Sequence, residues 1–325
     1  MPTPPSPPPA RARRVRAAFV IAASLGVLLA ACSTSGSSAE AGSTTTGSTA
    51  PGSTTTTTAA SSPTVPADRP IDVAVPKTYR PGSPAPLLVL LHGYTADGKL
   101  QGAYLHMPQA ADAAGMLYVA PDGTKNALGN RFWNATDACC AKGRNPVDDS
   151  TYLLAVIDQV KAQYDVDPKR VFVVGHSNGG FMSYRMACDH ADVIAAVASI
   201  EGATWDDPSR CQPSAPVSAL EIHGTADETI AYDGGSILGS AYPSATQTVK
   251  TWAGYDGCDP TPVRPAPADR RIEKDHPPAT VTRYGGCRAH TGVELWTQPD
   301  GTHIPSWTDD FSTQIIDWLQ AHPKA

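Results

Sequence analysis

Short runs of consecutive apolar residues recur along the chain from residue 87 onwards, each bounded by polar residues or by glycine and proline. Runs of this length, rich in Val, Leu and Ile, predict strands that are buried on both faces of a parallel sheet. The predicted strands cover residues 87–91, 116–120, 171–174, 195–200, 217–222 and 293–296. The second of them ends at a Pro-Asp-Gly turn, residues 121–123.

Two other segments show helical spacing. In Thr151–Tyr164 the apolar residues recur three and four positions apart, which is typical of a helix with one buried face. Asp148, Asp149 and Ser150 precede it, and we interpret the two acids as the start of the helix rather than as a catalytic carboxylate pair. Phe311–Leu319 predicts a closing helix. The alternation of strands and helices predicts an α/β fold, with a mostly parallel central sheet flanked by helices in a single domain.

The first residues show a different pattern, which indicates a processed leader. Four arginines between positions 11 and 16 precede the apolar run Ala17–Ala31, which at about 15 residues is shorter than the roughly 20 that cross a bilayer. The run ends in Leu-Ala-Ala-Cys, which resembles a bacterial lipobox. We interpret residues 1–31 as a lipoprotein signal peptide and Cys32 as the lipidated new N-terminus. The alternative is an ordinary secretory signal cleaved nearby, with Cys32 incidental.

The residues that follow the leader predict a tether. Residues 33–66 consist almost entirely of Ser, Thr, Gly, Ala and Pro, so they cannot bury enough apolar surface to offset the entropy of ordering. With Cys32 they form the expected tether 32–66, and such a chain reaches roughly 30 Å. Residues 67–325 are the expected folded domain. The protein is expected at the cell surface as an anchored lipoprotein, or else secreted, with membrane contact only through the lipid.

Composition and charge exclude several classes of protein. Of 325 residues, 41% are apolar, which is too many for a wholly disordered chain, and 17% are charged, which is too few for a coiled coil. The net charge is −6, and no basic stripe follows the leader, so we expect no nucleic-acid partner. We expect a monomer.

The cysteine count fits an exported protein. Besides Cys32 there are six cysteines, and an even number in an exported chain predicts disulfides. The sequence leaves the pairing open, and we favour Cys258–Cys287, Cys188–Cys211 and Cys139–Cys140. Clustered cysteines can instead bind metal, but no Cys-x-x-Cys or histidine-rich partner set is present, so no metal site is predicted. Between Pro260 and Gly286 lie eight prolines or glycines, and we expect this excursion not to form a core element.

The strongest chemical motif follows the predicted strand 171–174. Gly175-His176-Ser177-Asn178-Gly179-Gly180 places a G-x-S-x-G sequence between a strand and a helical segment. In this context the glycines relieve crowding in a sharp turn that projects the serine hydroxyl. We therefore predict that Ser177 is a nucleophile, and the alternative is a plain glycine-rich turn.

A serine nucleophile needs an oriented base. His303 lies after the last predicted strand and before the last helix, and Asp227 follows the predicted strand 217–222. The chain order of serine, acid and histidine agrees with one known arrangement of such triads. His303 would take the Ser177 proton, and Asp227 would hold the imidazole in the correct tautomer. Glu228 is the alternative acid.

The developing oxyanion needs two donors. The backbone N–H of Asn178, directly after the nucleophile, is one candidate. The second should come from the loop after strand 87–91, where Tyr94 is our choice and Thr95 the alternative. An ordinary tight turn is the competing interpretation of this loop.

Together these motifs carry a family resemblance. LLHGYTADG, PDG, FWNATDACC with the following VDDSTYL, VGHSNGGFMSYRMAC, IHGTADETI and DGTHIP resemble the secreted polyhydroxybutyrate depolymerase/feruloyl esterase group of α/β hydrolases, from about residue 69 to the C-terminus. The resemblance implies a serine esterase without a cofactor, acting on a polyester or on hydroxycinnamoyl esters of polysaccharide, with Ser177, Asp227 and His303 as its triad. Many members have GGHxWP around the histidine, whereas this chain has GTHIPSW, with the tryptophan displaced to Trp307.

Aromatic residues near the predicted site are candidates for substrate binding. Trp133, Trp205 and Trp307, together with Tyr94, could hold a phenolic acyl group or a polyester repeat, although core packing explains each of them equally well. Two alternatives to an ester hydrolase remain at this point. One is an acyltransferase on the same fold, in which an alcohol replaces water, and the other is a catalytically silent binding lipoprotein.

Overall fold

The computed structural model describes residues 64–140, 147–265 and 269–325. The signal peptide, Cys32 and nearly all of the expected tether lie outside the described residues. Every described residue belongs to one compact unit, Ala59–Ala325.

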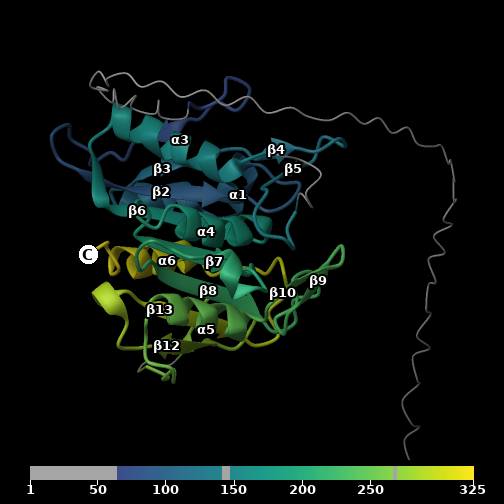
Figure 1. The fold of residues 1–325 in the computed structure, drawn as a ribbon. Coiled ribbons are helices and arrows are strands. Elements are labelled where there is room, and N and C mark those ends of the chain that lie inside the picture. Colours follow the sequence, from purple (N-terminus) through teal and green to yellow (C-terminus); the bar gives the residue numbers. More distant parts are fainter. Residues whose placement is uncertain (1–63, 141–146, 266–268) are drawn as a thin grey trace, which may run out of the picture. The chain divides into compact units, whose positions relative to one another are not determined.

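A nine-stranded sheet forms the centre of this unit (Figure 1). Its strands, in spatial order, are β1 (Val73–Ala74), β3 (Leu117–Val119), β2 (Ala85–Leu91), β6 (Val166–His176), β7 (Ala196–Ile200), β8 (Ser218–Gly224), β13 (Val293–Gln298), β12 (Ala279–Tyr284) and β11 (Asp269–Arg270). The six strands from β3 to β13 are parallel, and the strands at the two edges are antiparallel. Each of the six strands predicted from an apolar run lies in this parallel block.

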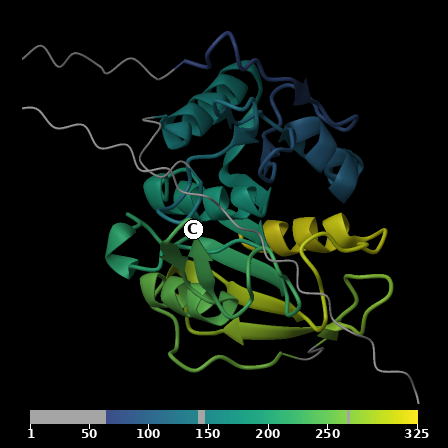
Figure 2. The same cartoon turned by 90° about the vertical axis from the view of Figure 1, so that its right-hand side faces the viewer.

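Helices cover both faces of the sheet, as expected. One face packs against α1 (Gly98–Leu105), α2 (Met107–Ala113) and α6 (Phe311–Gln320), and the other against α3 (Asp149–Gln163), α4 (Asn178–Asp189) and α5 (Ala245–Tyr255). Figure 2 shows the yellow helix α6 and the blue helices on one side of the strands and the teal and green helices on the other. Two short 3-10 turns, Pro208–Arg210 and Arg288–His290, lie in loops.

The apolar runs are continuous because each strand supplies both layers of core. In β2, Leu87, Val89 and Leu91 pack among the helices of one face, and Leu88 and Leu90 among those of the other. All five side chains are at most 1% exposed. None of the described helices has the length and apolarity needed to span a bilayer.

The segment between Cys258 and Cys287 differs from the expectation. We expected no core element there, yet it contributes β12, which pairs with β13 over residues 280–284. Ala279 and Val281 are buried on β12, and Ile272, just before it, is fully buried. The expectation was wrong because the prolines cluster before the strand and the glycines after it, and the alternating sequence Ala-Thr-Val-Thr-Arg-Tyr between them is free to pair.

Two hairpins extend beyond the carboxyl ends of the parallel strands. One is formed by β4 (Thr124–Lys125) and β5 (Arg131–Phe132), the other by β9 (Gly235–Ile237) and β10 (Ser240–Tyr242). In Figure 1 both lie to the right, the direction in which the β2 arrow points. They therefore flank the edge of the sheet where open α/β folds place their sites.

The six cysteines of the described residues pair as we favoured, in the disulfides Cys139–Cys140, Cys188–Cys211 and Cys258–Cys287. The acidic pair at the start of α3, the N-cap Asp148 and the first helical residue Asp149, also has the expected structural role. The Asp148 side chain accepts a hydrogen bond from Thr151 N, and Asp149 is buried in an ion pair with Arg69 at 2.8 Å.

Candidate active site

Ser177 occupies a sharp turn between β6 and α4. Its backbone has φ 55° and ψ −120°, a left-handed conformation that is strained for a residue with a side chain. The flanking glycines explain how the turn fits. A Cβ on Gly175 would lie 2.0 Å from the Gly179 carbonyl oxygen, and one on Gly179 would lie 2.2 Å from the Leu91 carbonyl oxygen. The G-x-S-x-G spacing therefore lets strand, turn and helix approach closely enough to present the serine.

His303 lies on the loop after β13 and bridges the serine and the acid. Its Nε2 is 2.9 Å from Ser177 Oγ, and its Nδ1 is 2.7 Å from Asp227 Oδ2. The three residues are 50 and 76 positions apart along the sequence, yet parallel strands bring their carboxyl ends to one edge of the sheet. The structure thus brings together the three residues predicted to form a triad.

The carboxylate of Asp227 is held in place by its own loop. Its Oδ1 accepts hydrogen bonds from the backbone N–H groups of Thr229 and Ile230, both at 2.8 Å. Burial acts to raise the pKa of Asp227, but the hydrogen bond and Coulomb interaction with His303 and the two N–H groups outweigh it and lower the pKa. Asp227 is therefore an ionised acceptor suited to orient an imidazole and to stabilise it when it becomes charged.

The loops that carry the acid and the base are joined directly. Thr225 N donates to Gln298 O, Ala226 N donates to Gly301 O, and Asp300 N donates to Thr225 Oγ1. A Cβ on Gly224 would lie 2.3 Å from the Gly301 carbonyl oxygen, so glycine permits this approach. These contacts fix the separation of Asp227 and His303 through the backbone.

Two backbone N–H groups remain available to bind an oxyanion. In the loop after β2, Gly93 N donates to Gln101 Oε1 and Thr95 N donates to Arg131 O. Tyr94 N, between them, has no acceptor among the described residues. Asn178 N is the first N–H of α4 and so has no partner within the helix. The structure therefore favours Tyr94 over Thr95, because the N–H of Thr95 is already used.

The Asn178 side chain ties these two donors together. Its Oδ1 accepts from Trp133 N at 2.7 Å, and its Nδ2 donates to Trp133 O at 2.9 Å. The Trp133 indole N–H in turn donates to His92 O at 2.9 Å, next to the Gly93-Tyr94 loop. The sequence indicated the backbone of Asn178 but not this role of its side chain, because the contact spans 45 positions.

The expectation for Trp133 is therefore corrected. Its side chain is 0% exposed and packs between His92 and Tyr152. Trp133 therefore supports the loop after β2 from inside the core and does not line a substrate cleft. Trp307 is also corrected, since its ring stacks on Phe311 with the centroids 3.8 Å apart and is buried in the core beside α6. Both rings are packed in the core, which is the alternative that the sequence left open.

Trp205 lies elsewhere. It lines a cavity of about 640 Å³ together with Arg185, Arg210 and Asp137. The residues that line this cavity do not include the three triad members. Tyr94 and Ile304, by contrast, are 45% and 69% exposed next to the oxyanion loop and to His303. Tyr94 carries a candidate oxyanion N–H and Ile304 directly follows His303, so both exposed apolar side chains belong to the loops of the site.

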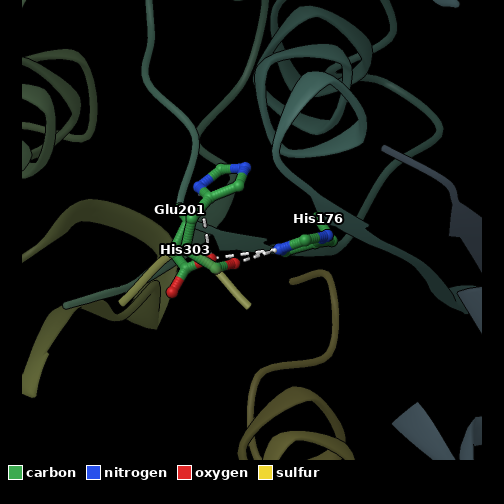
Figure 3. Close-up of side chains that lie close together, drawn as sticks. All are labelled: His176, Glu201 and His303. Atoms are coloured by element: carbon green, nitrogen blue, oxygen red, sulfur yellow. Dashed lines mark hydrogen bonds and ion pairs between the residues drawn. The ribbon is translucent and has the colours of Figure 1, made fainter. Parts of the chain in front are cut away.

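A second carboxylate, which the sequence analysis missed, lies beside His303. Glu201, directly after β7, has its Oε2 3.0 Å from His176 Nε2 and 3.5 Å from His303 Nδ1 (Figure 3). Two imidazoles and a carboxylate this close could hold a metal ion. However, His176 Nε2 also lies 3.0 Å from His303 O, which can only accept a hydrogen bond, so this nitrogen carries a proton and is not free to ligate. We interpret the cluster as a hydrogen-bond network.

The geometry as a whole suits nucleophilic acyl transfer. A serine hydroxyl contacts an imidazole, and the imidazole contacts a carboxylate. The backbone N–H groups of Tyr94 and Asn178 are candidates to bind the carbonyl oxygen that receives negative charge. Each of these groups is supplied by the protein chain itself.

Comparison with known proteins agrees with this geometry. The family model described as "Alpha/beta hydrolase family" matches residues 88–315. The chain is 29% identical to "Putative esterase NocK" of Nocardia uniformis subsp. tsuyamanensis, over 70% of this chain and 66% of that protein. It is 27% identical to "Feruloyl esterase B" of Piromyces equi, over 72% of this chain and 42% of that protein. The matches thus span about two thirds of the first relative and less than half of the second.

Among solved structures, the chain resembles "Acetyl xylan esterase from Aspergillus awamori" with a TM-score of 0.55 and 17% identity. The match covers 79% of this chain and 95% of that chain. At this identity the likeness concerns the fold alone.

Proposed function

Because the chain belongs to the alpha/beta hydrolase family, we propose that it is a carboxylic ester hydrolase that works through an acyl-enzyme on Ser177. The observation that carries the proposal is the position of His303, which contacts Ser177 Oγ and Asp227 Oδ2 at the same time. A glycine-rich turn with a purely structural role would not require an imidazole in this position. The named esterases among its relatives support the same reaction class.

In the first half-reaction Ser177 Oγ attacks the ester carbonyl carbon and its proton passes to His303 Nε2. The negative charge on the carbonyl oxygen is bound by the N–H groups of Tyr94 and Asn178. Asp227 stabilises the imidazolium through Nδ1–H without taking its proton. The intermediate then collapses, the bond to the alcohol oxygen breaks, and His303 donates the proton to the leaving alcohol.

In the second half-reaction water replaces the alcohol. His303 removes a proton from water, the hydroxide adds to the acyl carbon, and the same two N–H groups bind the oxyanion. Collapse breaks the bond to Ser177 Oγ, which regains its proton from His303. The products are a carboxylic acid, an alcohol and the unchanged enzyme.

For the substrate we propose an ester with an apolar acyl group, either a hydroxycinnamoyl ester of polysaccharide or a hydroxyalkanoate polyester. The exposed side chains of Tyr94, in the proposed oxyanion loop, and Ile304, next to His303 in sequence, offer apolar surface for such a group. The relative named feruloyl esterase favours the hydroxycinnamoyl ester. Trp205 is a proposed contact for a part of the substrate remote from the ester, because its cavity lies apart from the triad.

A hydrolysis panel tests this proposal. Purified protein is assayed with methyl ferulate, short p-nitrophenyl esters, a feruloylated polysaccharide and a hydroxybutyrate polymer, with Ser177→Ala as the control. We expect hydrolysis of at least one class and none by the variant. Addition of an acceptor alcohol reports transfer, since a transferase would form a new ester in preference to the free acid. Failure to hydrolyse any ester, or equal rates for wild type and variant, would contradict the proposal.

We also propose that the enzyme is exported and anchored through a lipid on Cys32. Three disulfides in the described residues are typical of a chain that folds in an oxidising compartment. The expected anchor is tested by fractionating cells that express the full chain. We expect the wild type in the membrane fraction and Cys32→Ser in the soluble fraction or retaining its leader. A wild-type protein that is wholly soluble would contradict the proposed lipid anchor but not the proposed export.

A further inference from the structure

Glu201 is a buried carboxylate that the mechanism above does not use. It is 1% exposed, and it lies at the end of β7, between the strand that leads to Ser177 and the strand that leads to Asp227. Its Oε2 is 3.5 Å from His303 Nδ1, the atom that Asp227 Oδ2 contacts at 2.7 Å. One imidazole nitrogen of the triad therefore has two carboxylates within reach, supplied by different strands.

The same oxygen of Glu201 is also joined to the His303 backbone through His176. His176 Nε2–H points at Glu201 Oε2 and at His303 O, each at 3.0 Å (Figure 3). Burial, the largest effect on His176, lowers its pKa, so the ring is a neutral donor. His176 directly precedes the nucleophile. This contact therefore links the turn that carries Ser177 to the loop that carries the base.

The backbone of Glu201 has a strained conformation that directs the side chain toward His303. Its φ is 55°, in the left-handed region that few residues other than glycine adopt without strain. Its N–H is held by Ile222 O at 2.8 Å. Ser177, at the end of the neighbouring strand, has the same φ. Two strained residues on adjacent strands thus direct their side chains toward one imidazole.

We propose that Glu201 is a positioning residue for His303, a reserve acceptor that binds Nδ1–H when the Asp227 carboxylate is absent or displaced. The inference rests on the proposed function, because it assigns a role toward the base of the same triad. At 3.5 Å the Glu201 oxygen is a secondary partner while Asp227 is present. Loss of the Asp227 side chain leaves it as the nearest carboxylate to Nδ1.

The surroundings of Glu201 fit a reserve role. The titratable groups that face it are His176, His223, Asp227, Glu273, His303 and Tyr104. Burial is the main cause that raises the pKa of Glu201 well above its usual value, and the Asp227 charge raises it further. Removal of Asp227 eliminates one of these causes, so Glu201 ionises more readily in the situation where a second carboxylate is needed.

A double-mutant cycle on the full chain tests this inference. Asp227→Ala is expected to lower kcat by about 10²-fold, less than the ~10⁴-fold loss reported for a triad whose acid is replaced. Glu201→Gln alone should lower kcat by less than about tenfold, and the double variant by about 10⁴-fold, which exceeds the product of the single effects. If the two losses simply multiply, Glu201 has only a structural role and the inference fails. If Asp227→Ala does not fold, Asp227→Asn takes its place in the cycle.

Glu294→Gln is the matched control. Glu294 is fully buried on β13 and pairs with Arg283 and Trp296, away from His303. Glu294→Gln should lower kcat by the same factor in the wild type and in Asp227→Ala. An equal synergy for Glu294→Gln would show that the effect is general destabilisation, which would overturn the inference.

A measurement without substrate separates this inference from the proposed function. The low-field proton resonance of His303 Nδ1–H should persist in Asp227→Ala and disappear in Asp227→Ala/Glu201→Gln. Its loss in Asp227→Ala alone would contradict the reserve role even if the wild type hydrolyses esters. Its persistence in a protein without esterase activity would support the contact and contradict the proposed function.

Discussion

Asn178 shows how one residue can serve a site through two separate groups. Its backbone N–H is a candidate oxyanion donor, and its side-chain amide pairs with both backbone groups of Trp133. Trp133 in turn holds His92, beside the loop that supplies the second donor. The Asn178 side chain therefore connects the turn after β6 to the loop after β2, which carries the second candidate donor.

Replacement of Asn178 by alanine should separate these two contributions. The backbone N–H remains in Asn178→Ala, but the two hydrogen bonds between the side-chain amide and the Trp133 backbone are lost. The N–H groups of Tyr94 and residue 178 are then free to move apart. We expect kcat to fall by roughly 10–10²-fold with little change in KM, somewhat less than removal of an oxyanion donor itself causes. Steady-state kinetics on a p-nitrophenyl ester provide the measurement.

Asn134→Ala is the control for that variant. Its amide donates to Val147 O at 2.8 Å and does not contact Trp133. It should leave kcat within about threefold of wild type, as expected for a side chain outside the reacting groups. If Asn178→Ala is as active as Asn134→Ala, the hydrogen bonds between Asn178 and Trp133 have no part in catalysis.

The sequence predicted the triad at this scale but not its surroundings. Ser177, Asp227 and His303 follow predicted strands, so the rule that sites gather at carboxyl ends was sufficient to group them. Glu201 and the Asn178 amide act through contacts 102 and 45 positions away in sequence, which no local pattern encodes. The one local indication was a glutamate at the end of a buried apolar run, where an acid is costly unless it is paired.

At the scale of elements, the edge of the sheet depends on the Cys258–Cys287 disulfide. The bridge closes a loop with a sequence separation of 29 that contains β11 and β12, and β12 pairs with β13, the strand that leads to His303. In the chain-entropy model a loop of this length contributes about 3–4 kcal/mol to the free energy of unfolding. The bridge therefore supports the base indirectly.

The variant Cys258→Ser/Cys287→Ser should lose stability first and activity second. We expect a free energy of unfolding lower by about 3 kcal/mol and near-normal kcat at low temperature, with an activity loss that grows on warming. Thermal unfolding and kcat measured over the same temperature range provide the test. Cys188→Ser/Cys211→Ser is the control, because its loop of 23 is similar in length and ties α4 to a different loop. Equal activity loss in both variants at equal stability would remove the specific role of β12.

The element that sequence reasoning missed has a simple physical explanation. Proline cannot donate to a sheet, so a proline-rich segment argues against a strand when it is read as a whole. In the segment between Cys258 and Cys287 the last proline is Pro278, and the next six residues form β12. An alternation of Ala279 and Val281 with two threonines was present in the sequence, and the surrounding composition obscured it.

At the scale of the whole molecule, stability should depend on pH through a buried acid far from the triad. Asp256, at the end of α5, is 0% exposed, and its Oδ1 accepts from Val217 N. Burial raises the pKa of Asp256 to about 7. The folded state therefore binds more protons than the unfolded state between about pH 4 and pH 7, so this group makes the protein less stable as pH rises through that window.

Asp256→Asn should remove this dependence, because the amide oxygen can still accept from Val217 N without carrying charge. We expect its Tm to exceed that of the wild type by a few degrees at pH 8 and by much less at pH 4, in line with roughly 2–4 °C per kcal/mol for a domain of this size. Asp206→Asn, which removes an exposed carboxylate, should not show this trend. A Tm difference that is the same at both pH values would contradict the assignment.

The global fold was the most predictable level. Strands buried on both faces give continuous apolar runs, and their alternation with helices leaves few topologies other than a parallel sheet covered on both sides. The antiparallel edge strands and the two hairpins are short and partly exposed, so they lack such runs and were not predicted.

Whether Ser177 forms a covalent acyl intermediate can be measured directly. Wild-type protein is mixed rapidly with p-nitrophenyl acetate, the release of p-nitrophenol is followed, and the quenched protein is mapped by mass spectrometry. We predict trapped acetyl on the peptide that contains Ser177, and no labelling of that peptide in Ser177→Ala, whose kcat should be lower by at least about 10³-fold. A folded Ser177→Ala protein that keeps a tenth of the activity, or acetyl found only on another residue, would contradict the account.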